Sequence, residues 1–118
     1  MRDHCQLRAF VLADELVLII YQISRCFPKE EIYGLTSQIR RAVVSVASNI
    51  VEGSARSSQT EYLRFLEIAY GSLKESHYQY TIAARLGYVP PVDTGNCEQK
   101  FIETEKVLAA LIRSLRKH

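Results

Sequence analysis

Two adjacent arginines and a line of short polar side chains are the residues of this sequence best suited to chemistry. Arg40 and Arg41 lie in the segment GLTSQIRRAVVSVASNIVEGS, residues 34–54. A guanidinium group binds phosphate or carboxylate through several N–H donors held in one plane. Consecutive side chains of a helix point about 100° apart, so we expect the two arginines to face different sides. We therefore do not expect both guanidinium groups to bind the same ligand.

Four glutamates and one histidine suggest acid–base or metal chemistry as an alternative. They are Glu52, Glu61, Glu67, Glu75 and His77. A di-iron bundle site would need Glu-x-x-His pairs on two further helices, and this sequence has none. His77 is expected at the edge of the core, hydrogen-bonded, with a tyrosine hydroxyl as one candidate partner. We therefore predict no metal and no other cofactor.

Ser45, Ser48 and Asn49 have the side chains of a nucleophile or an amide-binding group, but nothing nearby would activate a serine. No histidine lies within helical reach of them, and no glycine-rich elbow precedes a serine. Short polar side chains that let two helices approach closely explain them better. The sequence therefore predicts no catalytic residue and no enzyme.

Four helices are expected to carry these residues, over about 3–26, 35–52, 58–86 and 93–117. Gly53 is expected to end the second helix as a left-handed cap, and Ser58 with Glu61 forms a capping-box pattern that opens the third. Gly87 is expected to cap the third helix, and the two prolines that follow force the chain out of it. Asp93 or Thr94 is the expected N-cap of the fourth.

Apolar spacing assigns a core face to each helix. In the second helix the core stripe is Leu35, Ile39, Val43, Val46 and Ile50, and the opposite side carries a polar line, Gln38, Arg41, Ser45, Ser48 and Glu52. The first helix has Leu7, Val11, Leu18 and Tyr21 on one side, with Phe10, Val17 and Ile20 beside them. This coverage is broader than one bundle stripe needs. A subunit interface on the first helix would explain it.

Length and composition indicate one domain over residues 1–118. The chain has 47% hydrophobic residues and shows no strand pattern, so we predict an all-α, antiparallel, up-down-up-down four-helix bundle. Its 15 basic and 13 acidic residues give a net charge of only +2. Three cysteines without a CxxC pair suit reduced thiols, and we expect no signal or membrane-spanning segment. We expect a soluble, cytoplasmic protein that does not contact a membrane.

The run LTSQIRRAVVSVASNIVEGSARSSQTEYLRFLEIAYGSLKE, with FPKEEIYG and ARLGY on either side, resembles a known family. It is similar to the small bacterial four-helix-bundle proteins known from intervening sequences in 23S ribosomal RNA genes, over residues of about 7–89. The resemblance implies subunits that gather into a ring, a homopentamer, with an architecture related to the accessory protein of diversity-generating retroelements. Family members often carry proline at the position of Ala47 and an acidic residue at that of His77, so this chain departs from the family there.

By this analogy, the function expected first is a non-enzymatic oligomeric scaffold that binds RNA or a ribonucleoprotein partner. Arg40, Arg56 and Arg64 are the residues expected to contact nucleic acid. Arg41 is instead expected in a polar network with Ser45, Ser48, Glu52 and Glu61, pairing with an acidic side chain such as Glu52, Glu61 or Glu67 across helices or subunits. The alternative function is a protein-interaction adaptor that binds no nucleic acid.

Overall fold

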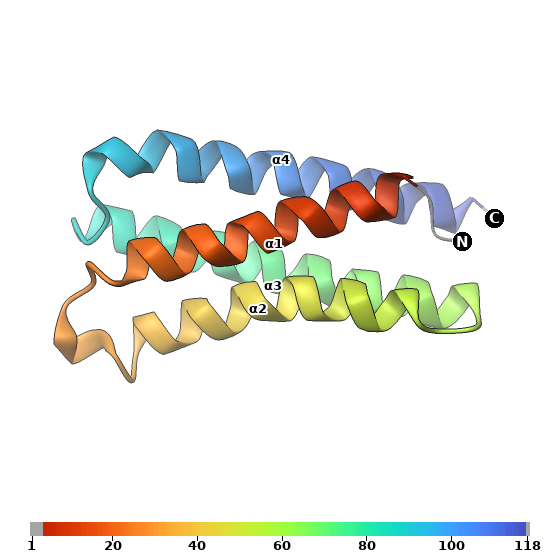
Figure 1. Cartoon of the computed structure of the whole chain (residues 1–118), viewed down its shortest axis with the longest axis horizontal. Coiled ribbons are helices and arrows are strands. Elements are labelled where there is room, and N and C mark those ends of the chain that lie inside the picture. Colours follow the sequence, from red (N-terminus) through yellow and green to blue (C-terminus); the bar gives the residue numbers. More distant parts are fainter. Residues whose placement is uncertain (1–3, 118) are drawn as a thin grey trace.

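The computed structural model describes residues 4–117, and within them every regular element is a helix (Figure 1). The elements are α1 (His4–Ser24), a single 3-10 turn η1 (Lys29–Glu31), α2 (Leu35–Ser54), α3 (Gln59–Arg85) and α4 (Pro91–Arg116). The bundle is elongated, with extents of 45 × 26 × 17 Å. The predicted all-α four-helix bundle is confirmed.

The helices pack as the four edges of a box. α2 contacts α1 and α3, and α4 contacts α3 and α1, which closes the box. No Cα atoms of the diagonal pairs approach within 8 Å of each other in the part of the chain that is described. The α1/α2 side therefore lies opposite the α3/α4 side, and the two sides face away from each other.

The core is filled from all four helices. Its largest fully buried apolar side chains are Leu16 and Ile20 from α1, Ile39, Val43, Val46 and Ile50 from α2, Tyr62, Leu66 and Leu73 from α3, and Phe101 and Leu108 from α4. Each such side chain stabilises the fold by about 1.5–3 kcal/mol relative to exposure. The predicted stripe of α2 is confirmed, with Leu35 only partly buried at its start.

The residues of α1 that pack into the core are not the bulky apolar residues that stand out in the sequence. Ala9, Ala13, Leu16 and Ile20 are the residues that pack inward. Leu7, Val11, Leu18 and Tyr21, by contrast, are 59%, 43%, 63% and 39% exposed. Two small alanines allow close contact with neighbouring helices, so the bulkier side chains are left on the outside of the monomer.

Two of the predicted helix ends are wrong. Gly53 does not cap α2, which continues to Ser54 with right-handed geometry at the capping residue Ala55. Gly53 is instead buried where α2 crosses α3: a Cβ built there would lie 2.9 Å from Phe65 Cβ and 3.1 Å from Tyr62 Cδ1. The glycine is needed for close helix approach and not for a left-handed turn.

The start of α4 was also predicted too late. The helix begins at Pro91, so Asp93 and Thr94 lie within its first turn instead of capping it. Proline is well accommodated at the first helical position, because its missing N–H would have no helical partner there. The predicted start and end of the third helix are confirmed. The Ser58 hydroxyl accepts the Glu61 N–H at the start of α3, and Gly87 follows that helix with φ of +80°.

Glu31 of η1 connects the loop before α2 with the loop after α3 by hydrogen bonds. One carboxylate oxygen accepts the Leu35 N–H at 3.0 Å, at the start of α2, and the other accepts the Tyr88 hydroxyl at 3.0 Å. This hydrogen bond to Glu31 raises the pKa of Tyr88. None of the helices described is both long enough and apolar enough to cross a membrane.

Candidate interaction surfaces

Arg40 links the start of α2 to the end of α1. Its Nε donates to Ser24 Oγ at 2.7 Å, one terminal nitrogen donates to the Tyr21 carbonyl at 3.4 Å, and the guanidinium lies 4.7 Å from the centre of the Tyr21 ring. The C-terminal carbonyls of a helix carry partial negative charge, so a cation there is favourable. The guanidinium of Arg40 is thus occupied within the chain, which disfavours its predicted contact with nucleic acid.

Arg41 points away from Arg40, as the helical geometry predicts, and is exposed. It lies at the rim of a shallow hollow between α2 and α3, lined also by Gln38, Ser45, Ser72 and Glu75. Within residues 5–117 it makes no ion pair or hydrogen bond, so the expected pairing with Glu52, Glu61 or Glu67 does not form inside one chain. A pairing across subunits stays a prediction.

The other residues of the predicted polar network do not lie together. Ser45 is half-buried: its hydroxyl is 2.9 Å from that of Ser72 on α3 and accepts the Asn49 amide at 3.0 Å. This places a hydrogen bond between α2 and α3. Ser48 and Glu52 are exposed on the outside of α2, and Glu61 is exposed on α3, away from Ser45.

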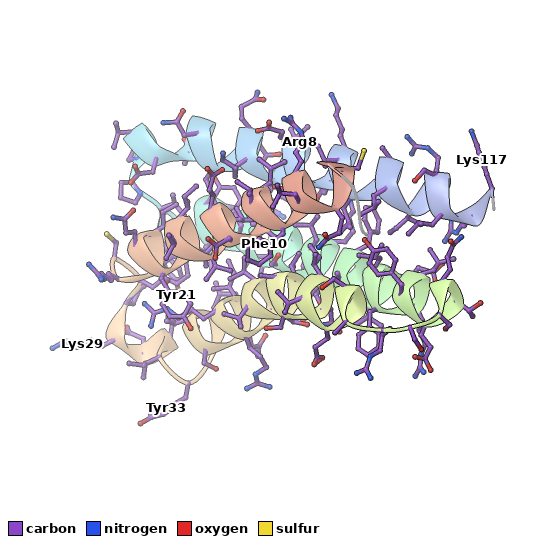
Figure 2. All side chains as sticks on the ribbon, turned by 45° about the vertical axis from the view of Figure 1, so that its right-hand side comes forward. Arg8, Phe10, Tyr21, Lys29, Tyr33 and Lys117 are labelled. Atoms are coloured by element: carbon purple, nitrogen blue, oxygen red, sulfur yellow. The ribbon has the colours of Figure 1, made fainter. Side chains whose placement is uncertain are left out.

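Basic side chains gather at the end of the box where α2 turns into α3 and where α4 ends. The two segments meet there, since Gln59 Nε2 donates to the Leu115 carbonyl at 2.9 Å. The cations at this end are Arg56, Arg64, Arg113, Arg116 and Lys117. Figure 2 labels Lys117 here and Lys29 at the opposite end. This grouping, which we call the basic end, contains two of the three arginines predicted to bind nucleic acid.

The guanidiniums of the basic end have different surroundings. Arg56 lies over the Phe65 ring, with 4.7 Å from its Cζ to the ring centre, and Arg116 donates to Glu67 at 2.6 Å. Arg64 and Lys117 are exposed and have no ion-pair partner in the described part of the chain. The α4 contribution was missed in the sequence, because only the fold brings the end of α4 beside the start of α3.

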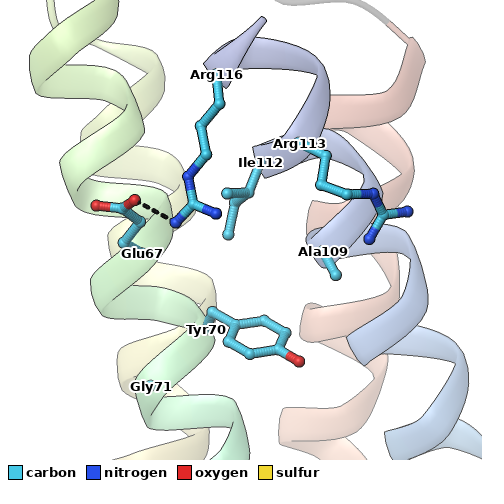
Figure 3. Close-up of a pocket in the computed structure, with 7 residues that line it drawn as sticks. All are labelled: Glu67, Tyr70, Gly71, Ala109, Ile112, Arg113 and Arg116. Atoms are coloured by element: carbon cyan, nitrogen blue, oxygen red, sulfur yellow. Dashed lines mark hydrogen bonds and ion pairs between the residues drawn. The ribbon is translucent and has the colours of Figure 1, made fainter.

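A groove of about 490 Å³ runs between α3 and α4 (Figure 3). Gly71 and Ala109 leave it open, since nothing lies within 4 Å of the position that a Cβ on Gly71 would occupy. Tyr70 and Ile112 form its apolar lining, and Glu67, Arg113 and Arg116 stand around it. Figure 3 shows Arg116 turned toward Glu67, while Arg113 points away from both.

The side opposite this groove is apolar. On α1 it consists of Leu7, Phe10, Val11, Val17, Leu18 and Tyr21, and on α2 of Val44, Ala47 and Val51, with Asp14 among them. Figure 2 labels Phe10 and Tyr21 on α1. Four of these apolar side chains are more than 40% exposed: Leu7 at 59%, Val11 at 43%, Leu18 at 63% and Val51 at 51%. We call this surface the α1/α2 face; exposed apolar patches of this kind mark interaction sites.

His77 joins α3 to α4 at the edge of the core. Its Nδ1 is 2.6 Å from a Glu105 oxygen, its Nε2 is 3.0 Å from a Glu98 oxygen, and its ring stacks on Phe101 with 4.6 Å between centres. A protonated imidazole donates from both nitrogens and satisfies both carboxylates. Lys74 Nζ lies 3.6 Å from Glu105. His77 is hydrogen-bonded as predicted, but its partners are glutamates and not a tyrosine.

Two ionisable groups, Cys97 of α4 and Tyr80 of α3, are buried in the core. Burial, with smaller contributions from Glu98 and Asp93, raises the pKa of the Cys97 thiol from 9.0 to about 12. Burial is also the main cause that raises the pKa of Tyr80 from 10.0 to about 12, and its hydroxyl donates to the Thr94 carbonyl at 2.9 Å. A thiol that ionises so late is a poor nucleophile. Both groups act here as parts of the core.

The described residues contain no group of three His, Cys, Asp or Glu side chains placed to hold a metal ion. The surface features that remain are exposed cations, an open groove and an apolar face. Fold and surfaces together define a small four-helix-bundle protein.

Comparison with known proteins agrees with this class. The sequence model of the 23S rRNA-intervening sequence protein family matches residues 6–110, and the chain belongs to this family. Among solved structures, a protein of unknown function from the S23 ribosomal protein family of Bacteroides thetaiotaomicron has the same fold. It is similar with a TM-score of 0.83 and 20% identity, over 92% of this chain and 98% of that one. No curated protein matches. The family predicted from the sequence is confirmed.

Proposed function

We propose that this chain is a subunit of a non-enzymatic oligomeric scaffold, a homopentameric ring by the resemblance, that binds RNA or a ribonucleoprotein partner through its basic end. The observation that carries the proposal is the gathering of Arg56, Arg64 and Lys117 at one end of the box. Ring symmetry would repeat this end in every subunit, so several weak phosphate contacts would act together.

The structure changes the set of residues proposed for RNA contact. Arg40 is left out, because it lies at the other end of the box and bonds to α1. Lys117 takes its place beside Arg56 and Arg64. Five copies of a chain with net charge +2 would carry 5 × (+2) = +10, and the exposed cations of the basic end would recur in every subunit.

Titration of a labelled single-stranded RNA at about 50 mM and about 200 mM salt tests the proposal. Replacing Arg56, Arg64 and Lys117 together by glutamine should weaken binding at low salt. It should also flatten the log–log salt dependence by about 0.7 per lost contact, because fewer counterions are released. Arg25, Lys29 and Arg85, replaced together by glutamine, are the matched control: the same charge is lost at the opposite end, and binding should change little.

The alternative function is a protein-interaction adaptor without nucleic-acid binding, and the apolar α1/α2 face favours it. Absence of RNA binding by the unaltered chain at low salt would overturn the RNA proposal and leave the adaptor ahead. Equal losses in the two triple variants would show a response to net charge only, with no role for the basic end. Light scattering on each variant separates loss of binding from loss of assembly.

A further inference from the structure

We propose that the α1/α2 face of one copy of this chain docks into the α3/α4 groove of the next copy, with Asp14 of one subunit pairing with Arg113 of its neighbour. This proposal rests on the oligomeric part of the proposed function and names the two surfaces that would make the contact. It does not depend on RNA binding.

The docking side is a ridge with regular spacing. Leu7, Val11, Asp14 and Leu18 follow one another at intervals of four, three and four residues, so they form one line along α1. This is the spacing with which a helix packs lengthwise against another helix. The three apolar members are between 43% and 63% exposed, which is far more than a covered face would show. The ridge has the pattern of an interface but no partner within the monomer.

Asp14 is the only acidic residue in this line, and it stands without a partner among the described residues. The charged neighbours on the adjoining side of α1 are already occupied: Glu15 pairs with Lys100 at 2.8 Å and Arg8 with Glu103 at 2.9 Å, both on α4. Burial of an unpaired carboxylate against an apolar surface would be costly. A partner that covers the ridge must therefore bring a cation to Asp14.

The groove on the opposite side of the box supplies the complementary shape and charge. It is hollow at Gly71 and Ala109, where apolar side chains of a ridge can enter, and Tyr70 and Ile112 line it. Arg113 lies on the groove and has no ion-pair partner in the described range, unlike Arg116, which is bonded to Glu67. Arg113 can therefore pair with a carboxylate from another molecule without breaking an existing bond.

The position of Asp14 also argues against the simplest alternative, a two-fold dimer of ridge against ridge. Asp14 lies midway between Leu7 and Tyr21, so pairing this stretch of α1 with its copy in either direction would set Asp14 beside Asp14. Like charges facing each other in an interface disfavour that pairing. Docking ridge into groove avoids the repulsion. Because the two surfaces lie on opposite sides of the box, the contact is head-to-tail, which forms a ring when its rotation closes.

Charge reversal tests the pairing by the mass of the assembly. Asp14→Arg and Arg113→Asp should each shift the light-scattering mass toward the 13.5 kDa monomer at concentrations where the unaltered chain is assembled. The double variant Asp14→Arg with Arg113→Asp restores opposite charges and should recover the larger mass. Glu30→Arg, which makes the same charge change in η1, should leave the mass unchanged. Circular dichroism of each variant shows that the helices are intact.

Three outcomes would overturn the proposal. The unaltered chain could be monomeric, the two single variants could both remain assembled, or the double variant could recover no more than either single one. In the second and third cases the oligomer stands and only the assigned interface fails. An intact mass with no RNA binding would instead count against the proposed function and leave this interface standing.

Discussion

Arg40 and Arg41 are adjacent in the chain, yet their surroundings are unrelated. Arg40 is bonded to Ser24 and to the Tyr21 carbonyl at the end of α1, and its guanidinium covers the Tyr21 ring. Arg41 is exposed, with no bond inside the described chain. The helix turns the two side chains apart, and only one of the two directions leads to a neighbouring helix. One arginine therefore holds the monomer together and the other is available for intermolecular contact.

Exchanging each of these arginines for glutamine should separate the two roles. Arg40→Gln should lower the free energy of unfolding by about 1–2 kcal/mol, because it removes charge-assisted hydrogen bonds and a ring contact. Arg41→Gln should change it by less than about 0.5 kcal/mol, as expected for an exposed side chain. Urea denaturation at low protein concentration measures both. An equal or larger loss for Arg41→Gln would mean that the contacts of Arg40 contribute little to stability.

Among the helix pairs, α2 and α3 make the most extensive contact. The residues at their interface explain this: Gly53 lies against the base of Phe65 and against Tyr62, and Ser45 bonds to Ser72. Small side chains bring the two backbones close, so packing becomes tight and sensitive to volume. The α3/α4 pair is more open at Gly71 and Ala109, which is why a groove forms there.

Alanine in place of Gly53 should destabilise the protein although alanine favours helix. The new Cβ would lie 2.9 Å from Phe65 Cβ, an atom fixed to the backbone of α3 that cannot rotate away. We expect a loss of about 1–3 kcal/mol in the free energy of unfolding, as for other overpacked sites. Gly95→Ala in α4 is the control, since nothing lies within 4 Å of its Cβ position.

At Gly95 the change should instead stabilise the protein by up to about 1 kcal/mol, through helix propensity alone. Thermal or urea denaturation of the two variants side by side gives the comparison. If Gly53→Ala were as stable as Gly95→Ala, the close approach of α2 and α3 would not be what requires a glycine at position 53.

The whole molecule is a box whose core contains ionisable groups and whose opposite sides differ in character. Cys97 and Tyr80 are both buried in the core of the box, where they are 0% and 3% exposed. Their raised pKa values mean that the folded state holds these protons more tightly than the unfolded chain. This stabilisation is present in full below pH 9 and declines as the pH rises toward 12.

Alkaline unfolding should therefore depend on Cys97. Above pH 9 the Cys97 thiol lowers the free energy of unfolding by up to about 1.4 kcal/mol per pH unit until its folded pKa is approached. In Cys97→Ala the decline between pH 9 and about pH 11 should be shallower, even though the lost side chain lowers stability at neutral pH. Cys26→Ala, at an exposed position, should keep the original slope. Parallel curves for Cys97→Ala and the unaltered chain would contradict this prediction.

The sequence by itself determined the four helices and the family. Leu35, Ile39, Val43, Val46 and Ile50 recur with a helical period, Ser58 is followed by Glu61, and Gly87 is followed by prolines. These signals are local, because a helix is built from hydrogen bonds between residues four apart and its ends are set by a few neighbouring side chains. The sequence also named Arg56 and Arg64, which lie at the basic end.

The tertiary structure decided which residue meets which. His77 faces Glu98 and Glu105, Gly53 is pressed against α3, and Arg40 reaches α1, all through contacts between helices. The packing of the helices also places the end of α4 beside the start of α3, and the α1/α2 face opposite the groove. Periodicity fixes the direction of a side chain relative to its own helix axis. The partner in that direction depends on how the four helices pack, and this is a property of the folded chain alone.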